Sequence, residues 1–277
     1  MAATELLGPG CYRGYLAHIG EGSDASTHKA LVAFHGQTEP SQAYVKVYCA
    51  ATAPRGLANE FIGYALAKAA GLEVPAKSAI LRLNPSQSLF LPSGMSPQLD
   101  TQGNVIAWCV EELSGESPKQ LLTADAAAYA PLAEEIRKWP QLADTVALDD
   151  WLVNEDRNLG NLIRIGPRRF ALIDHGRVCT GLAWNRPLDR AVVDTINKLA
   201  LIAWGNPLTK EAPPPSHSQL FESINKLAEA LASAEIELDH WLPQLMGPED
   251  ESDVRGFLDV RTSFLPPHYQ AEFGLIA

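Results

Sequence analysis

Apolar and polar residues alternate in several short runs within the first 113 residues. Alternation of this kind is typical of strands that bury one face. It predicts strands at residues 13–19, 29–34, 43–48 and 105–113, with further strand character between residues 72 and 83. Residues 58–70 follow a helical spacing instead, and Gly71 supplies a usual C-terminal cap. The first part of the chain is therefore predicted to be a small β-rich unit with one helix.

Helical spacing dominates from residue 114 onward. It predicts one or two helices over residues 114–139, further helices at 141–153, 187–204 and 216–234, and two shorter helices in the remainder. A strand pair is predicted at 162–165 and 170–173, joined by a turn at residues 166–169. We therefore expect an α+β protein with two lobes, resembling a protein kinase. Its small β-rich N-lobe spans residues 1–113 and its larger helical C-lobe, carrying a β-ribbon, spans 114–277, with a hinge near residues 110–115.

Composition narrows the range of partners. The chain of 277 residues is 46% hydrophobic, carries a formal net charge of −11 and has a sequence pI of about 5.1. An acidic chain is repelled by nucleic acids and anionic membranes, so we expect neither as a direct partner. No run of about 18 apolar residues, no signal peptide and no zinc-type cysteine spacing is found, which favours a cytoplasmic location.

Three oxygen-bearing side chains flank the predicted ribbon in a fixed order. Asp156 and Asn161 precede its first strand, and Asp174 follows its second. The ribbon would bring them together at one end. Phosphoryl transfer needs such a set, with one carboxylate for the attacking hydroxyl and an amide and a carboxylate for Mg²⁺. We therefore predict Asp156 as the catalytic residue and Asn161 and Asp174 as the metal ligands.

A lysine in the middle of a predicted strand supplies a further part of this chemistry. Lys46 lies among apolar residues, and Glu60 lies near the start of the following helix. An edge strand with one solvated face would also explain Lys46, and a surface helix position would explain Glu60. A Lys–Glu pair would instead hold the ammonium against the phosphates of ATP. The order of the two elements favours the pair.

The remaining nucleotide contacts are expected from backbone groups. The loop at residues 20–27 contains Gly20, Gly22 and Ser23 and could cover phosphates, although a plain hairpin loop has the same composition. Glu112 and Leu113 end a buried strand, where the backbone could pair with the adenine edge. The loop opens no helix and the chain has no Gly-Lys-Ser/Thr sequence, so Rossmann and Walker-type sites are excluded.

Asp149 forms a second, overlapping Asp-x4-Asn match with Asn154. On a helical plot it falls on the apolar face of residues 141–153. A carboxylate there is costly unless it is hydrogen-bonded. We therefore expect Asp149 to accept hydrogen bonds from the loop at residues 154–160 and to hold that loop in shape.

The two acidic loops and the first helix resemble a known family. The sequences NEDRNLGNL at 154–162, ALIDHG at 171–176 and ANEFIGYALAKAAGLEVP at 58–75 are similar to those of the HipA-like atypical Ser/Thr kinases. The resemblance covers roughly residues 13–205. It implies an ATP- and Mg²⁺-dependent kinase in which Lys46 and Glu60 position ATP, Asp156 is catalytic, and Asn161 and Asp174 bind the metal.

The same resemblance implies further properties. Family members phosphorylate Ser or Thr on proteins, and some are toxins with an antitoxin partner. Self-phosphorylation of a serine in the glycine-containing loop would place Ser23, Ser26 or Thr27 as candidates. The chain departs from relatives at Asn158, where many have His, and at His175, where typical kinases have Phe. These departures leave open a catalytically silent nucleotide- or protein-binding module. A kinase of small molecules is a second alternative, because such kinases share the same ATP machinery.

Overall fold

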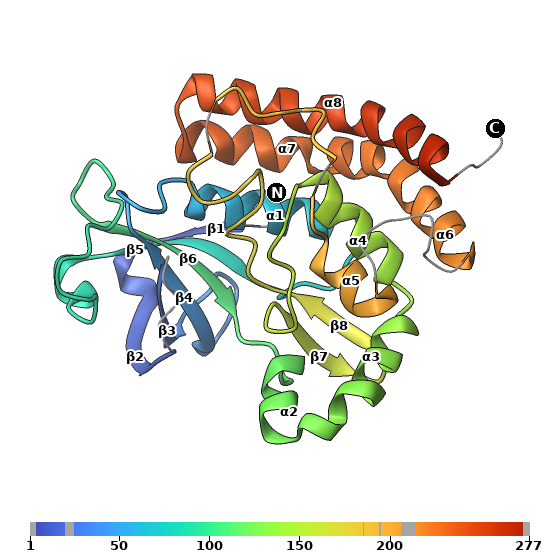
Figure 1. Ribbon diagram of the computed structural model, residues 1–277. Helices are drawn as coiled ribbons and strands as arrows, with labels where there is room; N and C mark the ends of the chain where they lie inside the picture. Colours follow the sequence, from blue (N-terminus) through green and yellow to red (C-terminus); the bar gives the residue numbers. More distant parts are fainter. Residues whose placement is uncertain (1–3, 20–24, 185, 194, 206–213, 274–277) are drawn as a thin grey trace.

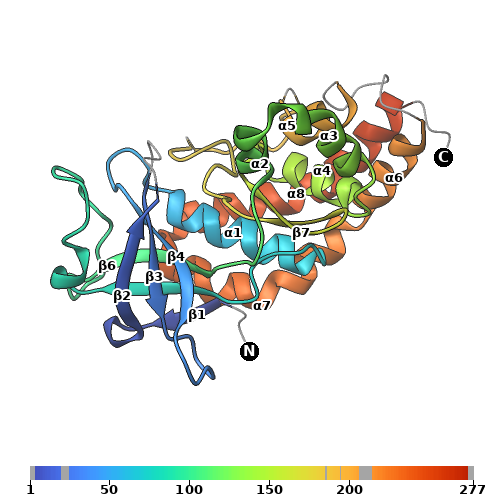
Figure 2. The same ribbon diagram turned by 90° about the horizontal axis from the view of Figure 1, so that it is seen from below.

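The computed structural model describes residues 4–19, 25–184, 186–193, 195–205 and 214–273 (Figure 1). It is a mixed α+β protein with a six-stranded sheet, a separate two-stranded ribbon and helices. The sheet occupies one end of the molecule and helices gather at the other, as Figure 2 shows from a second direction.

The six-stranded sheet has the order β1-β5-β6-β4-β3-β2. Its strands are β1 (Thr4–Leu7), β2 (Tyr12–His18), β3 (Ala25–Val32), β4 (Ser41–Tyr48), β5 (Ser78–Leu83) and β6 (Val105–Glu111). β1 runs parallel to β5, and every other pair is antiparallel. The alternation in the sequence located the other five strands, whereas β1 is too short to give such a signal.

The sheet curls around its own small core. Its edge strands β1 and β2 are joined by residues 8–11 alone. A connection of this length spans at most about 18 Å, whereas the edges of a flat sheet of six strands lie about 24 Å apart. The enclosed face carries alternate apolar residues, among them Ala43, Val45, Val47, Leu81, Ala107 and Cys109. Lys46 and Tyr48 alternate with these apolar residues along β4 and therefore lie on the opposite face of the sheet.

That opposite face is covered by helix α1 (Gly56–Ala69), which is packed on nearly all sides. Twelve of its 14 residues are buried. Alanine-rich sequence favours the helix, and Gly71, at φ 74°, ends it in the left-handed conformation that glycine adopts most easily. α1 contacts the sheet on one side and α7 (Leu227–Leu245) on another. Its position brings one face of the sheet into contact with the helical part.

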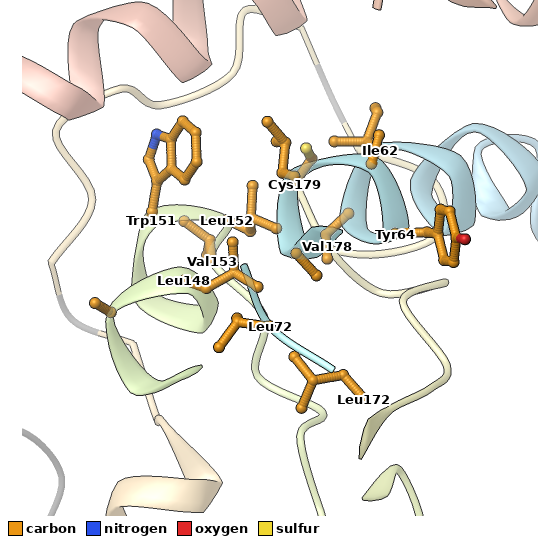
Figure 3. Close-up of a cluster of buried hydrophobic side chains, with 14 of the residues drawn as sticks. Ile62, Tyr64, Leu72, Leu148, Trp151, Leu152, Val153, Leu172, Val178 and Cys179 are labelled. Carbon is orange, nitrogen blue, oxygen red and sulfur yellow. The ribbon is translucent and has the colours of Figure 1, made fainter. Parts of the chain in front are cut away.

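The helical part surrounds the ribbon β7 (Leu162–Gly166) and β8 (Arg169–Leu172), which lies where the sequence predicted it. The helices are α2 (Pro118–Ala124), α3 (Tyr129–Arg137), α4 (Leu142–Trp151), α5 (Lys198–Trp204), α6 (Pro214–Asn225) and α8 (Pro248–Phe273). Side chains from α1, α4 and the segment after β8 meet in one buried cluster, as shown in Figure 3 by Ile62, Leu148 and Val178. No described helix is both long and apolar enough to cross a membrane.

Two helix predictions were wrong. The expected helix at residues 187–204 is reduced to α5, because distant groups engage the backbone of the preceding segment. The Leu188 N–H donates to Asp253 at 2.7 Å, and the carbonyl of Val192 accepts from Arg261 at 2.7 Å. A continuing helix would use the Val192 carbonyl to accept from the N–H of residue 196, so the bond from Arg261 takes the place of a helical one.

The second error concerns the C-terminal helices. The predicted helix at 216–234 is divided between α6 and α7, where the Asn225 side chain donates to the Phe221 carbonyl that a continuing helix would use. Beyond α7, the single helix α8 replaces the two short helices expected, and it continues through Pro266 and Pro267. Its buried residues recur at helical spacing, and their packing offsets the proline cost of about 3 kcal/mol each.

Candidate active site

Lys46 lies in the interior of the sheet, with β3 and β6 on either side of β4. An edge-strand position is therefore wrong. The Lys46 ammonium contacts Glu60 Oε1 at 2.6 Å and Asp174 Oδ1 at 2.8 Å. The expected pairing of Lys46 with Glu60 is present, and the same ammonium joins the sheet and α1 to the loop after β8.

Glu60 is 1% exposed, and the hydrogen bonds around it explain how a carboxylate is held there. Tyr48 donates its hydroxyl to Oε1 at 2.8 Å, and the backbone N–H of His175 donates to Oε2 at 2.9 Å. Both carboxylate oxygens are thus engaged, one of them by Lys46 as well. Tyr48 follows Lys46 by two positions on β4, so the strand directs both side chains to the same face.

Opposite charges determine the protonation of Lys46 and Asp174. Burial alone would lower the pKa of Lys46, but the nearby carboxylates of Asp174 and Glu60 raise it above its ordinary value. Partial shielding of the Asp174 carboxylate from water would raise its pKa, but Lys46 outweighs that effect and lowers it. Lys46 is therefore charged beside an ionised Asp174 at neutral pH.

The loop at residues 154–161 is built around a buried ion pair. Asp149, on α4, accepts from Asn154 Nδ2 at 2.7 Å and from Arg157 Nε and Nη2 at 3.1 Å each. Arg157 is fully buried and also donates to the carbonyls of Ile173 and Asn161, at 2.7 and 3.2 Å. Asp149 accepts the hydrogen bonds that the sequence led us to expect, and Arg157 links the loop to the end of β8.

This loop presents Asp156 at its surface. The Asp156 side chain remains 32% exposed and contacts Lys198 Nζ at 3.0 Å through Oδ1. Its backbone carbonyl accepts from Asn161 Nδ2 at 2.7 Å and from Asn158 Nδ2 at 3.0 Å. Asn158 also accepts from the Gly160 N–H at 2.7 Å, so it closes the loop as a turn residue. A histidine is not needed there to shape the loop.

Asn161 and Asp174 are brought together by the backbone. The N–H of Ile173 donates to the Asn161 carbonyl at 3.2 Å, which places the two loops side by side. Asp174 has φ 59°, a left-handed conformation that is uncommon for non-glycine residues but that aspartate adopts more readily than most. Its side chain is 44% exposed. This conformation leaves the carboxylate both against Lys46 and open to a ligand.

The donor set formed by Asn161 and Asp174 fits Mg²⁺. Asn161 uses its amide nitrogen on Asp156, and its amide oxygen accepts no hydrogen bond from the described residues. No group of three or more His, Cys, Asp or Glu side chains converges in the described part of the chain. Magnesium does not require such a cage, because it usually takes one or two protein oxygens and completes its shell with phosphates and water.

His175 packs the loop that follows β8, at residues 173–181, against α1. We call this segment the metal-side loop because it carries Asp174, a predicted metal ligand. A Cβ placed on Gly63 would lie 2.3 Å from the Cβ of His175, so only glycine admits the ring so close to the helix. Nδ1 of His175 lies 3.1 Å from Arg157 Nη2. Burial, together with the charges of Arg157 and Lys46, lowers the pKa of His175 well below its ordinary value, which keeps the ring neutral. His175 is thus a packing residue here.

The other candidate nucleotide contacts are less fully defined. Gly20, Gly22 and Ser23 lie outside the described residues. Ser26 is buried on β3, whereas Thr27 is half-buried beside Lys46.

Glu112 uses its backbone N–H on the Gln42 carbonyl at 2.8 Å, and its side chain contacts Lys29. The N–H of Glu112 is therefore engaged within the sheet and is not open to a base.

Several residues of the site escaped the sequence reasoning. Tyr48 could have been found from its two-residue spacing to Lys46, whereas nothing in the sequence distinguishes Arg157 as the partner of Asp149. Asn59 donates to the carbonyls of Gly176 and Gly181 and so ties α1 to the loop after β8. Lys198 gave no local signal, because it lies 42 residues after Asp156.

Comparison with known proteins adds no family assignment. No protein-family model matches the chain, and no curated protein sequence matches it. The chemistry of the site is therefore inferred from its own geometry. That geometry combines a buried ammonium fixed by two carboxylates, a half-exposed aspartate on a hydrogen-bonded loop, and a neighbouring amide–carboxylate pair.

Proposed function

We propose that this protein is an ATP- and Mg²⁺-dependent phosphotransferase of protein-kinase-like fold, similar to the HipA-like Ser/Thr kinases, and that it transfers the γ-phosphate to a protein hydroxyl. The observation that carries the proposal is the double contact of Lys46, with Glu60 at 2.6 Å and Asp174 at 2.8 Å. A lysine in a sheet, a glutamate in the next helix and a metal-side aspartate are the parts that position a triphosphate in kinases. In this proposal residues 1–113 form the N-lobe and residues 114–277 the C-lobe.

Each residue has a defined task in the proposed reaction. Lys46 contacts the phosphates of ATP and Glu60 keeps its ammonium in place, while the backbone near Leu113 faces the adenine. Asn161 and Asp174 hold Mg²⁺, which supplies positive charge against the triphosphate. Asp156 orients the acceptor hydroxyl and takes its proton as the hydroxyl oxygen bonds to the γ-phosphorus. The bond from the γ-phosphorus to the β–γ bridging oxygen breaks, and ADP leaves with the electron pair.

A protein acceptor follows from the resemblance, and so does an antitoxin-like partner. The two alternatives retain the same nucleotide site. A binding module would bind ATP without transfer, and a small-molecule kinase would place the phosphate on a metabolite or drug. Experiment distinguishes the three.

The test uses γ-labelled ATP, Mg²⁺ and a dialysed cell extract as acceptor. Wild type, Asp156→Ala and Asp174→Ala are compared after folding is checked by circular dichroism. The proposal expects label in protein with wild type and at least about 10²-fold less with either variant. Equal label in all three contradicts phosphotransfer by this site. Label restricted to added small molecules favours the small-molecule kinase, and MgATP binding without any label favours the binding module.

The acceptor itself can be identified in cells. Phosphoproteomes are compared after expression of wild type and Asp156→Ala. Phosphorylated Ser or Thr sites that require wild type name the substrates. Identical phosphoproteomes would contradict a protein acceptor.

A further inference from the structure

Lys198 is held beside Asp156 by the segment that leads into α5. Asn197 caps the helix, accepting from the Ala200 N–H at 3.0 Å, and donates to the Val146 carbonyl of α4 at 3.0 Å. Thr195 adds a hydrogen bond to Asp150, also on α4, at 3.1 Å. Because α4 leads into the Asp156 loop, these contacts fix where Lys198 begins relative to that loop.

The contact between Lys198 and Asp156 contributes too little to folding stability to account for its presence. The ammonium lies 3.0 Å from Asp156 Oδ1, and the two side chains are 42% and 32% exposed. Ion pairs with this exposure contribute little to folding, since water competes for both charges. The lysine stem is flexible and its ammonium is a compact charge. Lys198 can therefore leave Asp156 for another anion within reach without disturbing the core.

Two other cations of the site, Lys46 and Arg157, are already committed. Lys46 is fixed between Glu60 and Asp174. Arg157, the one cation inside the 154–161 loop, is fully buried against Asp149 and two backbone carbonyls. Neither can move toward charge that develops beside Asp156. Among the described cations, Lys198 is the one in direct contact with the proposed catalytic carboxylate.

We propose that Lys198 is a catalytic residue whose ammonium binds the γ-phosphoryl oxygens during transfer; this inference rests on the proposed function. As the acceptor oxygen bonds to the γ-phosphorus and ADP departs with the electron pair of the broken bond, charge is distributed over the three equatorial oxygens. Lys198 moves from Asp156 Oδ1 to these oxygens. Asp156 Oδ1 is thereby released to accept the proton of the acceptor hydroxyl. One lysine would thus stabilise the transferred group and uncover the base.

The test compares Lys198→Ala and Lys198→Arg with wild type, and Lys226→Ala serves as an exposed lysine control. Label transfer from γ-labelled ATP is measured together with the affinities for MgADP and for MgADP plus aluminium fluoride, a mimic of the phosphoryl group in flight. For Lys198→Ala we expect at least about 10²-fold slower transfer and comparably weaker binding of the fluoride complex, with MgADP affinity unchanged. Lys198→Arg should recover part of both losses, and Lys226→Ala should equal wild type.

Two results overturn the inference while leaving the proposed function intact. In the first, Lys198→Ala transfers phosphate at the wild-type rate, which shows that the lysine has no role in transfer. In the second, Lys198→Ala transfers phosphate faster than wild type, which shows that Lys198 inhibits Asp156. Absence of transfer by wild type itself is a different result, because it contradicts the proposed function. Circular dichroism of Lys198→Ala excludes unfolding as the cause of a loss.

Discussion

At the scale of single residues, the candidate site is determined by which charge each side chain contacts. Lys46 and Glu60 could be identified from sequence because a charge inside an apolar strand requires a partner, and the next helix supplies one. Asp149 could be identified in the same way from its place on an apolar helix face. The sequence could not reveal that Arg157 forms an ion pair with Asp149, since an arginine beside Asp156 is equally suited to binding phosphate. Only burial of its guanidinium excludes that role.

Replacement of Asp149 by Asn tests whether the buried pair shapes the loop. The change leaves the Arg157 guanidinium buried without its counter-charge, because the two groups are 3.1 Å apart and both inaccessible. Breaking such a pair costs about 3–5 kcal/mol. We expect urea denaturation to show a loss of this size, and phosphate transfer to fall at least about tenfold as the Asp156 loop loosens.

A matched control is Asp239→Asn, which removes an exposed carboxylate paired with Arg255. It should change the free energy of unfolding by less than about 1 kcal/mol. If Asp149→Asn is as stable as wild type and phosphorylates at the same rate, Asp149 does not hold the 154–161 loop in shape.

At the scale of elements, α1 connects the six-stranded sheet with the helical part, because it contacts β4 and β6 as well as α4 and α7. It carries Glu60 to Lys46, its Asn59 binds the loop after β8, and its Gly63 accommodates His175. The position of α1 and the position of the metal-side loop are therefore linked. His175 takes part in this packing, so the histidine that stands here in place of the phenylalanine of typical kinases is compatible with the site.

Gly63→Ala measures this link. Alanine normally stabilises a helix interior by about 1 kcal/mol over glycine. Here its Cβ would lie 2.3 Å from His175 Cβ, so either α1 or the loop must shift. We expect a loss of stability of about 1–3 kcal/mol and a fall in phosphate transfer of about 10²-fold, because Glu60 moves with the helix.

Thermal unfolding and label transfer give the two readouts for Gly63→Ala. Gly10→Ala is the control, since a Cβ at that position meets nothing within 4 Å. Wild-type transfer by Gly63→Ala would show that α1 and the loop are not linked.

At the scale of the whole molecule, sequence reasoning succeeded where structure is set locally. The ribbon, α1 and five of the six sheet strands follow from alternation, helical spacing and turn residues close together in the chain. It failed where partners are distant in sequence. β1 exists through pairing with β5 some 70 residues later, Leu188 and Val192 are held by α8, and Lys198 reaches Asp156 through the fold. No local pattern encodes such contacts.

Buried histidines make the stability of the molecule depend on pH. Burial lowers the pKa of His28 to about 4, and burial lowers that of His175 well below its ordinary value. In the unfolded chain histidine has a pKa of about 6.5. Between pH 6.5 and these lower values the unfolded state binds more protons than the folded state. Stability is therefore complete above pH 6.5 and decreases as the pH falls toward 4.

The prediction for His28 is a difference in slope. Urea denaturation between pH 7.5 and 5 should show wild type losing up to about 1.4 kcal/mol more per pH unit below 6.5 than His28→Gln. The comparison separates His28 from the buried carboxyls Asp149 and Asp150, whose pKa values burial raises. Parallel pH profiles for the two proteins would mean that His28 is not the group responsible.

The site around Lys46, Asp156 and Asp174 is proposed to break the terminal phosphate bond of ATP. The rate of ADP formation from saturating MgATP, in the presence of dialysed extract, measures this directly and without knowledge of the acceptor. Wild type and Asp156→Ala are compared, with nucleotide binding to both verified first. We predict that wild type forms ADP at least about 10²-fold faster than the variant. Equal rates from two folded, nucleotide-bound proteins would contradict the claim.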